Sequence, residues 1–280
     1  MIWRFRGRTL DLTTRGVIVG IVNVTPDSFS DGGTCPDPAS ATDHGLRLLA
    51  EGASFLDIGG ESTRPGSRPV TLEEELSRVI PTIAALRRVT DGPISVDTSK
   101  AVVARAALDA GADIINDVTA LGDPGMGAVV SGSDAGLILM HMNGVPATMQ
   151  ESPSYPDDDV VSEVAKYLSG RRTAALGFGV DPAAILLDPG LGFGKTAAHN
   201  FSLLRGIPRL SRLGSPLLIG HSRKSFLGPV PDGETPASAR MSAGVAVTAL
   251  ARTLGARIFR VHDIPAHLAA LRMAEELLTV

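Results

Sequence analysis

The sequence predicts a parallel α/β barrel of the TIM (β/α)8 type, preceded by a short β-hairpin. Short apolar or β-branched runs alternate eight times with longer segments of helical period along the 280 residues, which is the element order of such a barrel. No linker and no change in composition divides the chain, so we expect a single domain over residues 1–280. The alternative is an open, doubly wound sheet, but the first strand is followed by Asn-Val-Thr-Pro rather than by a Gly-x-Gly-x-x-Gly turn.

The first two elements predict the hairpin, and eight further runs predict the strands of the barrel. Residues 2–5 and 8–12 alternate in polarity and turn at Gly7, so we expect a hairpin within residues 1–14. The barrel strands are short runs rich in Val, Ile and Leu, which is typical of strands that are buried on both faces. We expect them at residues 17–22, 54–58, 94–96, 113–115, 137–140, 184–187, 217–219 and 257–260.

Helices are expected between these strands, and local signals mark several of their first turns. Asp37, Asp123 and Asp181 each precede a proline, which is typical of an N-cap followed by a first-turn proline. Thr71 and Glu74 have the spacing of a capping box. The expected helices cover residues 38–51, 72–89, 100–110, 124–132, 159–176, 198–212, 237–254 and 265–278.

Composition and charge exclude several classes of protein. Hydrophobic residues make up 44% and charged residues 20% of the chain, which is a globular composition. The formal net charge of −4 argues against nucleic acid as the main partner. Cys35 is the only cysteine, so neither an intrachain disulfide nor a Cys-based metal site can form. The first residues lack the apolar stretch of a signal peptide, and no apolar run approaches the ~20 residues that cross a bilayer; we therefore expect a cytoplasmic protein without a membrane partner.

A polar residue stands at or just beyond the end of nearly every predicted barrel strand. The carboxyl ends of the strands of a parallel barrel meet at one face, and active sites are built there. Polar groups that gather at this face without a ligand would cost free energy. The residues concerned are Asn23, Asp57, Asp97, Asn116, His141, Asp188, the run 222–225, Arg260 and His262.

Three of these strand ends carry carboxylates, Asp57, Asp97 and Asp188. Carboxylates in one cleft repel one another unless donors or cations separate them. A flat heterocycle rich in N–H groups, such as a pterin, would pair with one carboxylate through two hydrogen bonds. Asn116 would add an amide to this group, and Lys224 would donate to the ring carbonyl or to an acceptor nitrogen of the ring.

A second group of residues is cationic. Arg64, Arg260 and His262 are expected at the same face of the barrel, with the amide of Asn23 nearby. Arginine presents several donors in a planar fork that matches phosphate oxygens. This group therefore suits a diphosphate, and we expect it to lie apart from the carboxylates.

The segments that carry these residues resemble the signatures of dihydropteroate synthases. The resemblance extends from the hairpin to the last helix. It is carried by residues 20–33, 57–66, 95–98, 115–117, 140–142, 187–195, 222–228 and 260–263. It implies a TIM barrel that joins hydroxymethyl-dihydropterin diphosphate to para-aminobenzoate, with Mg²⁺ as cofactor. The products would be dihydropteroate and pyrophosphate, in folate biosynthesis, and sulfonamide drugs that mimic para-aminobenzoate would target the site.

The resemblance also implies a role for individual residues. The pterin would be held by Asp57, Asp97, Asn116, Met140, Asp188, Gly220 and Lys224. The diphosphate would be held by Asn23, Thr63, Arg64, Arg260 and His262, and the metal by Asn23. The para-aminobenzoate pocket would be formed by Phe29, Pro65, Phe193, Ser222, Lys224 and Ser225. Catalysis would rest on Asn23, Asp31, Arg64, Asp97, Lys224, Arg260 and His262.

The expected chemistry is loss of the diphosphate before the amine attacks. The aryl amine is a poor nucleophile, and the leaving group stands on a carbon next to an electron-rich ring. In this hypothesis the cationic group and Mg²⁺ stabilise the departing anion, while the carboxylates stabilise the cationic pterin. Asp31, on the first loop, would close over the cation. No covalent nucleophile is needed.

Two alternatives share the expected pterin contacts. One is the pterin-binding domain of a methyltetrahydrofolate-dependent methyltransferase, which has no need of Arg64, Lys224 and the pair Arg260 and His262 together. The other is a pterin-binding paralogue without catalysis, against which the presence of the same residues argues. Residues 192–195, Gly-Phe-Gly-Lys, also resemble a truncated phosphate loop, but they lack the spacing of a Walker site.

Some residues receive structural expectations only. His44, His199 and His267 lie on predicted helices and are expected to be solvated or to cap them. His221 and Asn143 depart from the commonest pattern of the family. The helix over residues 238–254 is apolar on several faces, which suggests a homodimer formed through this helix.

Overall fold

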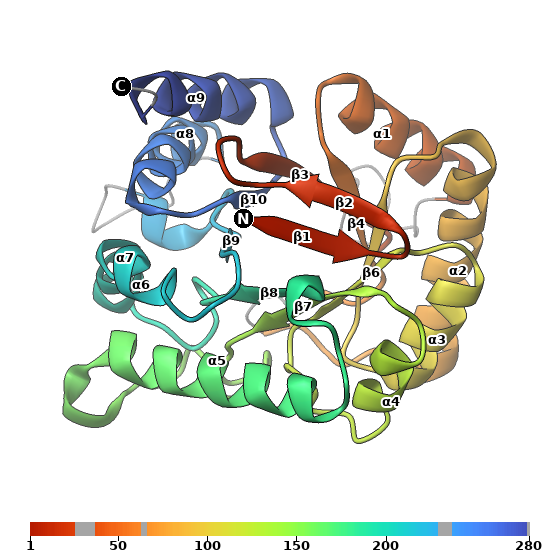
Figure 1. Cartoon of the computed structure of the whole chain (residues 1–280), viewed down its shortest axis with the longest axis horizontal. Helices are drawn as coiled ribbons and strands as arrows, with labels where there is room; N and C mark the ends of the chain where they lie inside the picture. Colours follow the sequence, from red (N-terminus) through yellow and green to blue (C-terminus); the bar gives the residue numbers. More distant parts are fainter. Residues whose placement is uncertain (26–36, 63–65, 229–236, 279–280) are drawn as a thin grey trace.

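Eight parallel strands form the centre of the computed structural model (Figure 1), which describes residues 1–25, 37–62, 66–228 and 237–278. The strands are β3 (Val17–Asn23), β4 (Phe55–Gly59), β5 (Ile94–Asp97), β6 (Ile114–Asp117), β7 (Gly136–Met140), β8 (Ile185–Asp188), β9 (Leu218–Ile219) and β10 (Ile258–Val261). Their order in the sheet is β8-β7-β6-β5-β4-β3-β10-β9. An isolated parallel bridge joins Leu187 to Leu217 and nearly closes the sheet, which confirms the predicted barrel.

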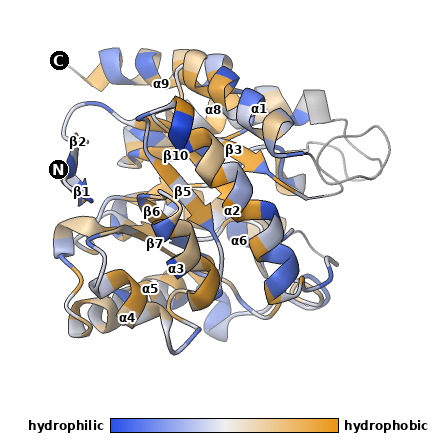
Figure 2. Cartoon of the chain, turned by 90° about the vertical axis from the view of Figure 1, so that its right-hand side faces the viewer, coloured by the Kyte–Doolittle hydropathy of each residue, from blue (hydrophilic) through white to orange (hydrophobic). Residues whose placement is uncertain are grey.

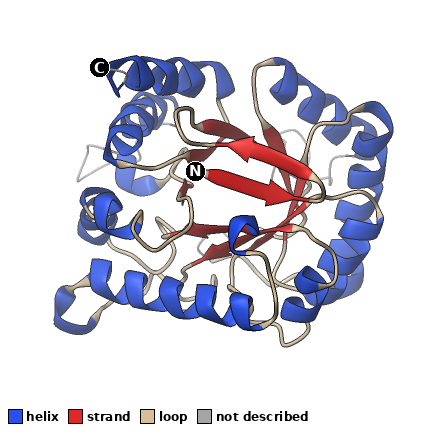
Figure 3. Cartoon of the chain, viewed as in Figure 1, coloured by secondary structure: helices blue, strands red, loops and turns tan. Residues whose placement is uncertain are grey.

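The helices form a ring around the strands (Figures 1 and 3). They are α1 (Pro38–Ala50), α2 (Leu72–Val89), α3 (Ala101–Asp109), α4 (Met126–Ser131), α5 (Val160–Gly177), α6 (Ala197–Arg205), α7 (Ile207–Leu210), α8 (Ala237–Leu254) and α9 (Ile264–Leu278). Three short 3₁₀ turns are η1 (Pro156–Asp158), η2 (Pro182–Ala184) and η3 (Ser225–Leu227). Among the described residues, no helix combines the length and apolar character that crossing a membrane requires.

The first turns of the helices show which local sequence signals correctly predicted where a helix begins. The Asp37 carboxylate accepts a hydrogen bond from the Ser40 amide at 2.9 Å, and the Thr71 hydroxyl accepts one from the Glu74 amide at 3.2 Å, as predicted for α1 and α2. Asp123 behaves differently, because its Oδ2 accepts from the amide of Ala101 at 2.9 Å, while its Oδ1 accepts from the amide of Gly125 at 2.8 Å. It therefore serves the first turn of α3 from a distance, and α4 begins only at Met126.

Two expectations about the helices were wrong. The single helix expected over residues 198–212 is divided into α6 and α7, because Pro208 has no amide hydrogen with which to continue the helical ladder. His267 is neither solvated nor a cap: it is 1% exposed, and its Nδ1 lies 2.7 Å from the hydroxyl of Thr248. His199 does act as a cap, since its ring accepts from the amide of Thr196 while the Thr196 hydroxyl accepts from the His199 amide.

The predicted hairpin covers one end of the barrel. Strands β1 (Ile2–Phe5) and β2 (Arg8–Asp11) pair antiparallel and lie across the centre of the ring in Figure 1. Trp3 and Phe5 are fully buried against apolar side chains from the amino ends of the barrel strands, such as Ile138 and Leu186. The Trp3 indole N–H donates to the carbonyl of Ala184 at 2.9 Å. In Figure 2 the apolar colours concentrate on the strands, with the hairpin on one side of them. Because this apolar plug fills the amino end of the barrel interior, the polar residues inside the described part of the barrel face its carboxyl end.

Candidate active site

A cavity of about 630 Å³ opens at the carboxyl end of the barrel strands. Most of the predicted site residues line it. These are Asn23, Asp97, Asn116, Met140, Asp188, Phe193, Gly220, Ser222, Lys224, Ser225, Arg260 and His262. Phe29, Asp31, Thr63, Arg64 and Pro65 lie outside the described residues. Asp57 is described, but it is not part of the cavity wall.

The register of the sheet explains why the polar strand ends meet. Asp97 at the end of β5 pairs with Asn116 of β6, and Met140 at the end of β7 pairs with Asp188 of β8. Side chains of paired residues in neighbouring parallel strands point to the same face, here the inside of the barrel. Amide and carboxylate groups that are far apart in the sequence are thus placed side by side.

Arg260 does not lie apart from the carboxylates: it forms ion pairs with two of them. Its Nε donates to Oδ2 of Asp57 at 2.5 Å, and its Nη2 donates to Oδ2 of Asp97 at 3.0 Å. Asn116 also donates to Oδ2 of Asp57, at 3.0 Å. The expected separation of carboxylates from cations is therefore wrong for Arg260. The reason is that the fully buried Asp57 requires a cation to compensate for lost hydration.

Burial changes the protonation behaviour of the site. It raises the pKa of Asp97 to about 7, against the opposing effect of Arg260. It also raises the pKa of Asp188, although Lys224 and the amide of Gly190 favour the ionised form. Burial lowers the pKa of Lys224 to about 8, and Asp188 limits that decrease. The carboxyl groups of Asp97 and Asp188 thus hold a proton more readily, and the amine of Lys224 less readily, than free side chains do.

Lys224 extends into the cavity from the segment after β9. Its Nζ donates to the carbonyl of Leu191 and lies 4.5 Å from the centre of the Phe193 ring, within cation–π range. Gly220 leaves room beside it, because a Cβ there would lie 3.7 Å from Oδ2 of Asp188 and 4.0 Å from Nζ of Lys224. A flat ring that enters the cavity therefore meets an ammonium and a carboxylate on the same wall.

His262 and Ser222 form a second polar contact of the cavity. The Nδ1 of His262 lies 3.1 Å from the Ser222 hydroxyl, which also accepts from the backbone amide of His262 at 3.3 Å. These residues follow β10 and β9, which are neighbours in the sheet. Asn23, at the end of β3 on the other side of β10, also lines the cavity. Donors suited to an anion thus surround Arg260.

Several cavity residues were missed by the sequence analysis. Arg240, in the first turns of α8, lines the cavity, and its buried Nε has no hydrogen-bond partner among the described residues. Met149 and Gln150 enter from the long segment after β7, and Glu61 from the segment after β4. Arg240 offered a signal, since it is a cation soon after the 222–228 motif. The others stand in loops, where neither period nor strand position marks them.

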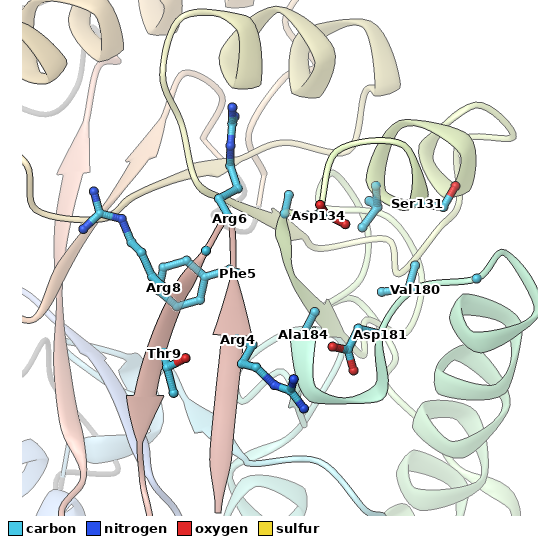
Figure 4. Close-up of a pocket in the computed structure, with 14 residues that line it drawn as sticks. Arg4, Phe5, Arg6, Arg8, Thr9, Ser131, Asp134, Val180, Asp181 and Ala184 are labelled. Atoms are coloured by element: carbon cyan, nitrogen blue, oxygen red, sulfur yellow. The ribbon is translucent and has the colours of Figure 1, made fainter.

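A smaller pocket of about 290 Å³ lies at the opposite end of the barrel, beside the hairpin (Figure 4). Arg4 and Arg8 of the hairpin line one side, and Asp134 and Asp181 line the other. Arg8 lies 3.7 Å from Asp113, and no predicted site residue lines this pocket. The chemistry predicted from the strand ends therefore belongs to the larger cavity.

The described residues contain no group of three or more His, Cys, Asp or Glu side chains that could hold a metal ion. Mg²⁺ does not require such a group, because it keeps several waters and binds one or two protein oxygens together with phosphate oxygens of a substrate. The amide oxygen of Asn23 at the cavity wall fits this kind of site.

Comparison with known proteins agrees with the geometry. The family model for pterin-binding enzymes matches residues 19–262. A dihydropteroate synthase of Synechocystis is 46% identical over 273 residues, which cover 97% of this chain and 93% of that protein. The crystal structure of Yersinia pestis dihydropteroate synthase with a sulfonamide drug has a TM-score of 0.93 at 41% identity over the whole of both chains. The Xanthomonas albilineans dihydropteroate synthase with 4-aminobenzoic acid has a TM-score of 0.91 at 48% identity, also over both whole chains.

Proposed function

Because the chain belongs to the dihydropteroate synthases, a family of pterin-binding enzymes, we propose that it joins hydroxymethyl-dihydropterin diphosphate to para-aminobenzoate, with dihydropteroate and pyrophosphate as products. The observation that carries this proposal is the cavity at the carboxyl end of the barrel. Carboxylates, an amide and an ammonium line its inner wall, and anion-binding donors surround Arg260. A substrate with a flat ring and a diphosphate needs both.

The pterin ring binds between Asp97, Asp188 and Lys224. The Oδ1 of Asp188 accepts from the Gly190 amide at 2.7 Å, while its Oδ2 faces Gly220 and is oriented toward the cavity. A carboxylate oriented in this way accepts two hydrogen bonds from the amine and ring N–H of a pterin. Asn116 supplies an amide at the same wall. Asp57 acts behind this wall, through its bonds with Arg260 and Asn116.

The diphosphate binds at Asn23, Arg260 and His262, and the family resemblance adds Thr63 and Arg64. Arg260 donates to Asp97 through Nη2 and to Asp57 through Nε, and its side chain also lines the cavity. It therefore connects the ring-binding carboxylate with the leaving group. We propose Mg²⁺ as the cofactor, held by Asn23 and the diphosphate; when bound, it neutralises charge on the leaving group. Equilibrium binding of the pterin diphosphate with and without Mg²⁺, compared in wild type and Asn23→Ala, tests this site without turnover.

The reaction proceeds by dissociation. The bond between the methylene carbon and the diphosphate oxygen breaks first, and its electron pair leaves with the oxygen toward Arg260 and His262. Asp97 and Asp188 stabilise the positive charge that develops on the pterin. The lone pair of the para-aminobenzoate amine then forms the new carbon–nitrogen bond with the methylene carbon, and the amine releases one proton to water. Asp31 and Arg64 act in the same steps in the family-based assignment.

Para-aminobenzoate binds against Phe193, with Ser222, Lys224 and Ser225 around it. Its aromatic ring suits the Phe193 face, and its carboxylate requires a cation or several donors. We assign that cation to Arg240, because its half-buried side chain lines the cavity and its buried Nε is unpaired among the described side chains. Phe29 and Pro65 complete this pocket in the family-based assignment.

Pyrophosphate release in the presence of both substrates and Mg²⁺ tests the proposed function. We expect release that depends on the pterin diphosphate and yields dihydropteroate once para-aminobenzoate is present. The variants Lys224→Ala and Asp188→Ala should lose most of this activity and keep a measurable remainder. A methyltransferase domain would release no pyrophosphate, and a non-catalytic paralogue would bind pterin without any turnover. Either result would refute the proposal.

We also propose that the enzyme is a cytoplasmic homodimer. Helices α8 and α9 pack against each other and leave large apolar side chains in solvent, among them Leu250 at 63% and Leu277 at 71% exposure. Apolar side chains that gather on neighbouring helices favour an interface with a second copy. Light scattering of the purified protein tests the dimer, with Leu250→Glu as the variant that should yield monomers. Cell fractionation tests the compartment.

A further inference from the structure

Lys195 is a buried lysine that no step of the proposed reaction uses. Its side chain is 2% exposed, although it does not line the cavity. Its Nζ lies 2.9 Å from the carbonyl of Phe193, 3.0 Å from Nδ1 of His141 and 3.4 Å from the carbonyl of His141. Among the described ion pairs, none includes Lys195. A buried amine without a carboxylate partner is costly, so its three contacts must offset the free energy of its lost hydration.

The three contacts of Nζ tie the segment after β8 to the end of β7. His141 is the first residue after β7, and its buried ring has a pKa lowered to about 3 by burial and by Lys195. The ring is therefore neutral, and its Nδ1 can accept a hydrogen bond. Phe193 lies two residues before Lys195, so the lysine side chain folds back over its own loop. Lys195 thus fixes residues 190–194 against a neighbouring strand.

The backbone of this loop is also held close to the residues that follow β7. Gly190 and Gly194 have φ values of +66° and +64°, and a Cβ on them would lie 1.9 Å and 2.1 Å from the carbonyl oxygens of His141 and Asn143. The amide of Lys195 donates to Oε1 of Gln150 at 3.0 Å. These close contacts hold residues 190–195 in place against the segment that follows β7. The Lys195 side chain lies at the centre of these contacts.

The same loop forms the seat of Lys224. The carbonyl of Leu191 accepts from Nζ of Lys224, and the Phe193 ring lies 4.5 Å from that nitrogen. Gly192 touches the lysine chain, because a Cβ there would lie 3.1 Å from Cδ of Lys224. The position of the Lys224 ammonium thus depends on three consecutive residues of the loop that Lys195 fixes.

We propose that Lys195 is a positioning residue that sets the place of the Lys224 ammonium in the cavity, by holding residues 190–194 through the Phe193 carbonyl and His141. It does not touch either substrate. The inference rests on the proposed function, since Lys224 is taken there to hold the pterin and para-aminobenzoate. A displacement of about 1 Å at such a group can cost on the order of 100-fold in rate.

A double-mutant cycle with Lys195→Met and Lys224→Met tests the inference. We expect Lys195→Met alone to lower kcat/KM by about 10- to 100-fold, and to lower it by less than about 3-fold when Lys224 is already methionine. Pterin affinity measured by calorimetry should show the same loss of effect in the double variant. Lys166→Met, at an exposed position of α5, is the matched control and should leave all these values unchanged. If Lys195 had only a structural role, Lys195→Met would lower kcat/KM by the same factor whether residue 224 is lysine or methionine. That result would overturn the inference.

The variant Lys195→Gln keeps the test decisive if Lys195→Met folds poorly. A glutamine amide can donate to the Phe193 carbonyl, so we expect it to recover most of kcat/KM, while thermal unfolding reports the fold separately. If the wild type is active and both Lys195→Gln and Lys195→Met have the same kcat/KM as the wild type, the positioning role alone is refuted. Absence of pyrophosphate release by the wild type would refute the proposed function, so the two failures are distinguishable.

Discussion

Arg260 donates from Nη2 to Oδ2 of Asp97 at 3.0 Å, which places the two side chains in one ion pair at the inner wall of the cavity. Arg260 is the cation proposed for the diphosphate, and Asp97 is a carboxylate proposed for the pterin. The negative charge of a diphosphate bound to Arg260 therefore changes the electrostatic potential at the Asp97 carboxylate. The pair couples binding of the ring to binding of the leaving group, which favours substrates that carry both.

We expect kcat/KM to follow a bell-shaped pH profile. Burial raises the pKa of Asp97 to about 7 and lowers that of Lys224 to about 8. Both oxygens of Asp97 accept from N–H groups and carry negative charge only when the carboxyl group is ionised, so activity should rise as the pH increases through about 7. It should fall above about 8, as Lys224 loses its proton. Steady-state kinetics across this range checks the prediction.

The variant Asp97→Asn provides the control for the acid limb of that profile. An amide does not titrate, so the residual activity of this variant should no longer rise near neutral pH. The alkaline limb should remain, because Lys224 is unchanged. An unaltered acid limb would show that another group carries it.

Asp57→Asn should lower activity although Asp57 does not line the cavity. Its Oδ2 holds both Arg260 and Asn116, so the substitution removes the charge that orients two cavity residues. Loss of a buried, charged hydrogen-bond partner costs about 1–3 kcal/mol. We expect the free energy of unfolding to fall by that amount, and kcat/KM to fall more than 10-fold. Chemical denaturation and kinetics with Asp57→Asn, Arg260→Lys and the double variant measure the coupling, and independent effects would contradict it.

Gly190→Ala should destabilise the enzyme strongly. Residue 190 has a φ of +66°, and its Cβ would lie 1.9 Å from the carbonyl oxygen of His141, which is backbone and cannot move freely. A clash of this kind belongs to the large effects of single substitutions, about 3 kcal/mol or more. Gly170→Ala is the control, because Gly170 lies within α5 with no atom near the added Cβ, and it should gain up to about 1 kcal/mol. Equal melting temperatures of the two variants would count against this account.

The fold and the inner wall of the site were predictable because both depend on short-range patterns. Buried parallel strands are continuous apolar runs, and the residue that ends each run faces the mouth of the barrel. Asp97, Asn116 and Asp188 follow from this rule, and the structure places them together. The register that unites them is set by neighbouring strands, which the order of the chain already indicates.

Contacts across the barrel could not be predicted in the same way. The ion pair of Arg260 with Asp57 joins residues 203 positions apart, and nothing in the local sequence of either residue specifies its partner. The burial of Lys195 could not be predicted from its residue type, since lysine side chains are rarely buried. Pro208 did carry a local signal, but the apolar period of residues 198–212 continues through it and hides the break between α6 and α7.

Arg240→Ala should affect para-aminobenzoate more than the pterin. The buried Nε of Arg240 has no partner among the described residues, and the side chain lines the cavity that also contains Phe193 and Ser225. If it binds the carboxylate of para-aminobenzoate, removal of a charge-assisted hydrogen bond costs about 1.5–3 kcal/mol, or about 10- to 150-fold in KM for that substrate. Pterin affinity should change less than about 2-fold, because the proposed pterin contacts come from other residues. Aniline, which lacks the carboxylate, should be used equally well by wild type and Arg240→Ala. A variant that loses aniline turnover together with para-aminobenzoate turnover would show that Arg240 supports the cavity instead of recognising the carboxylate.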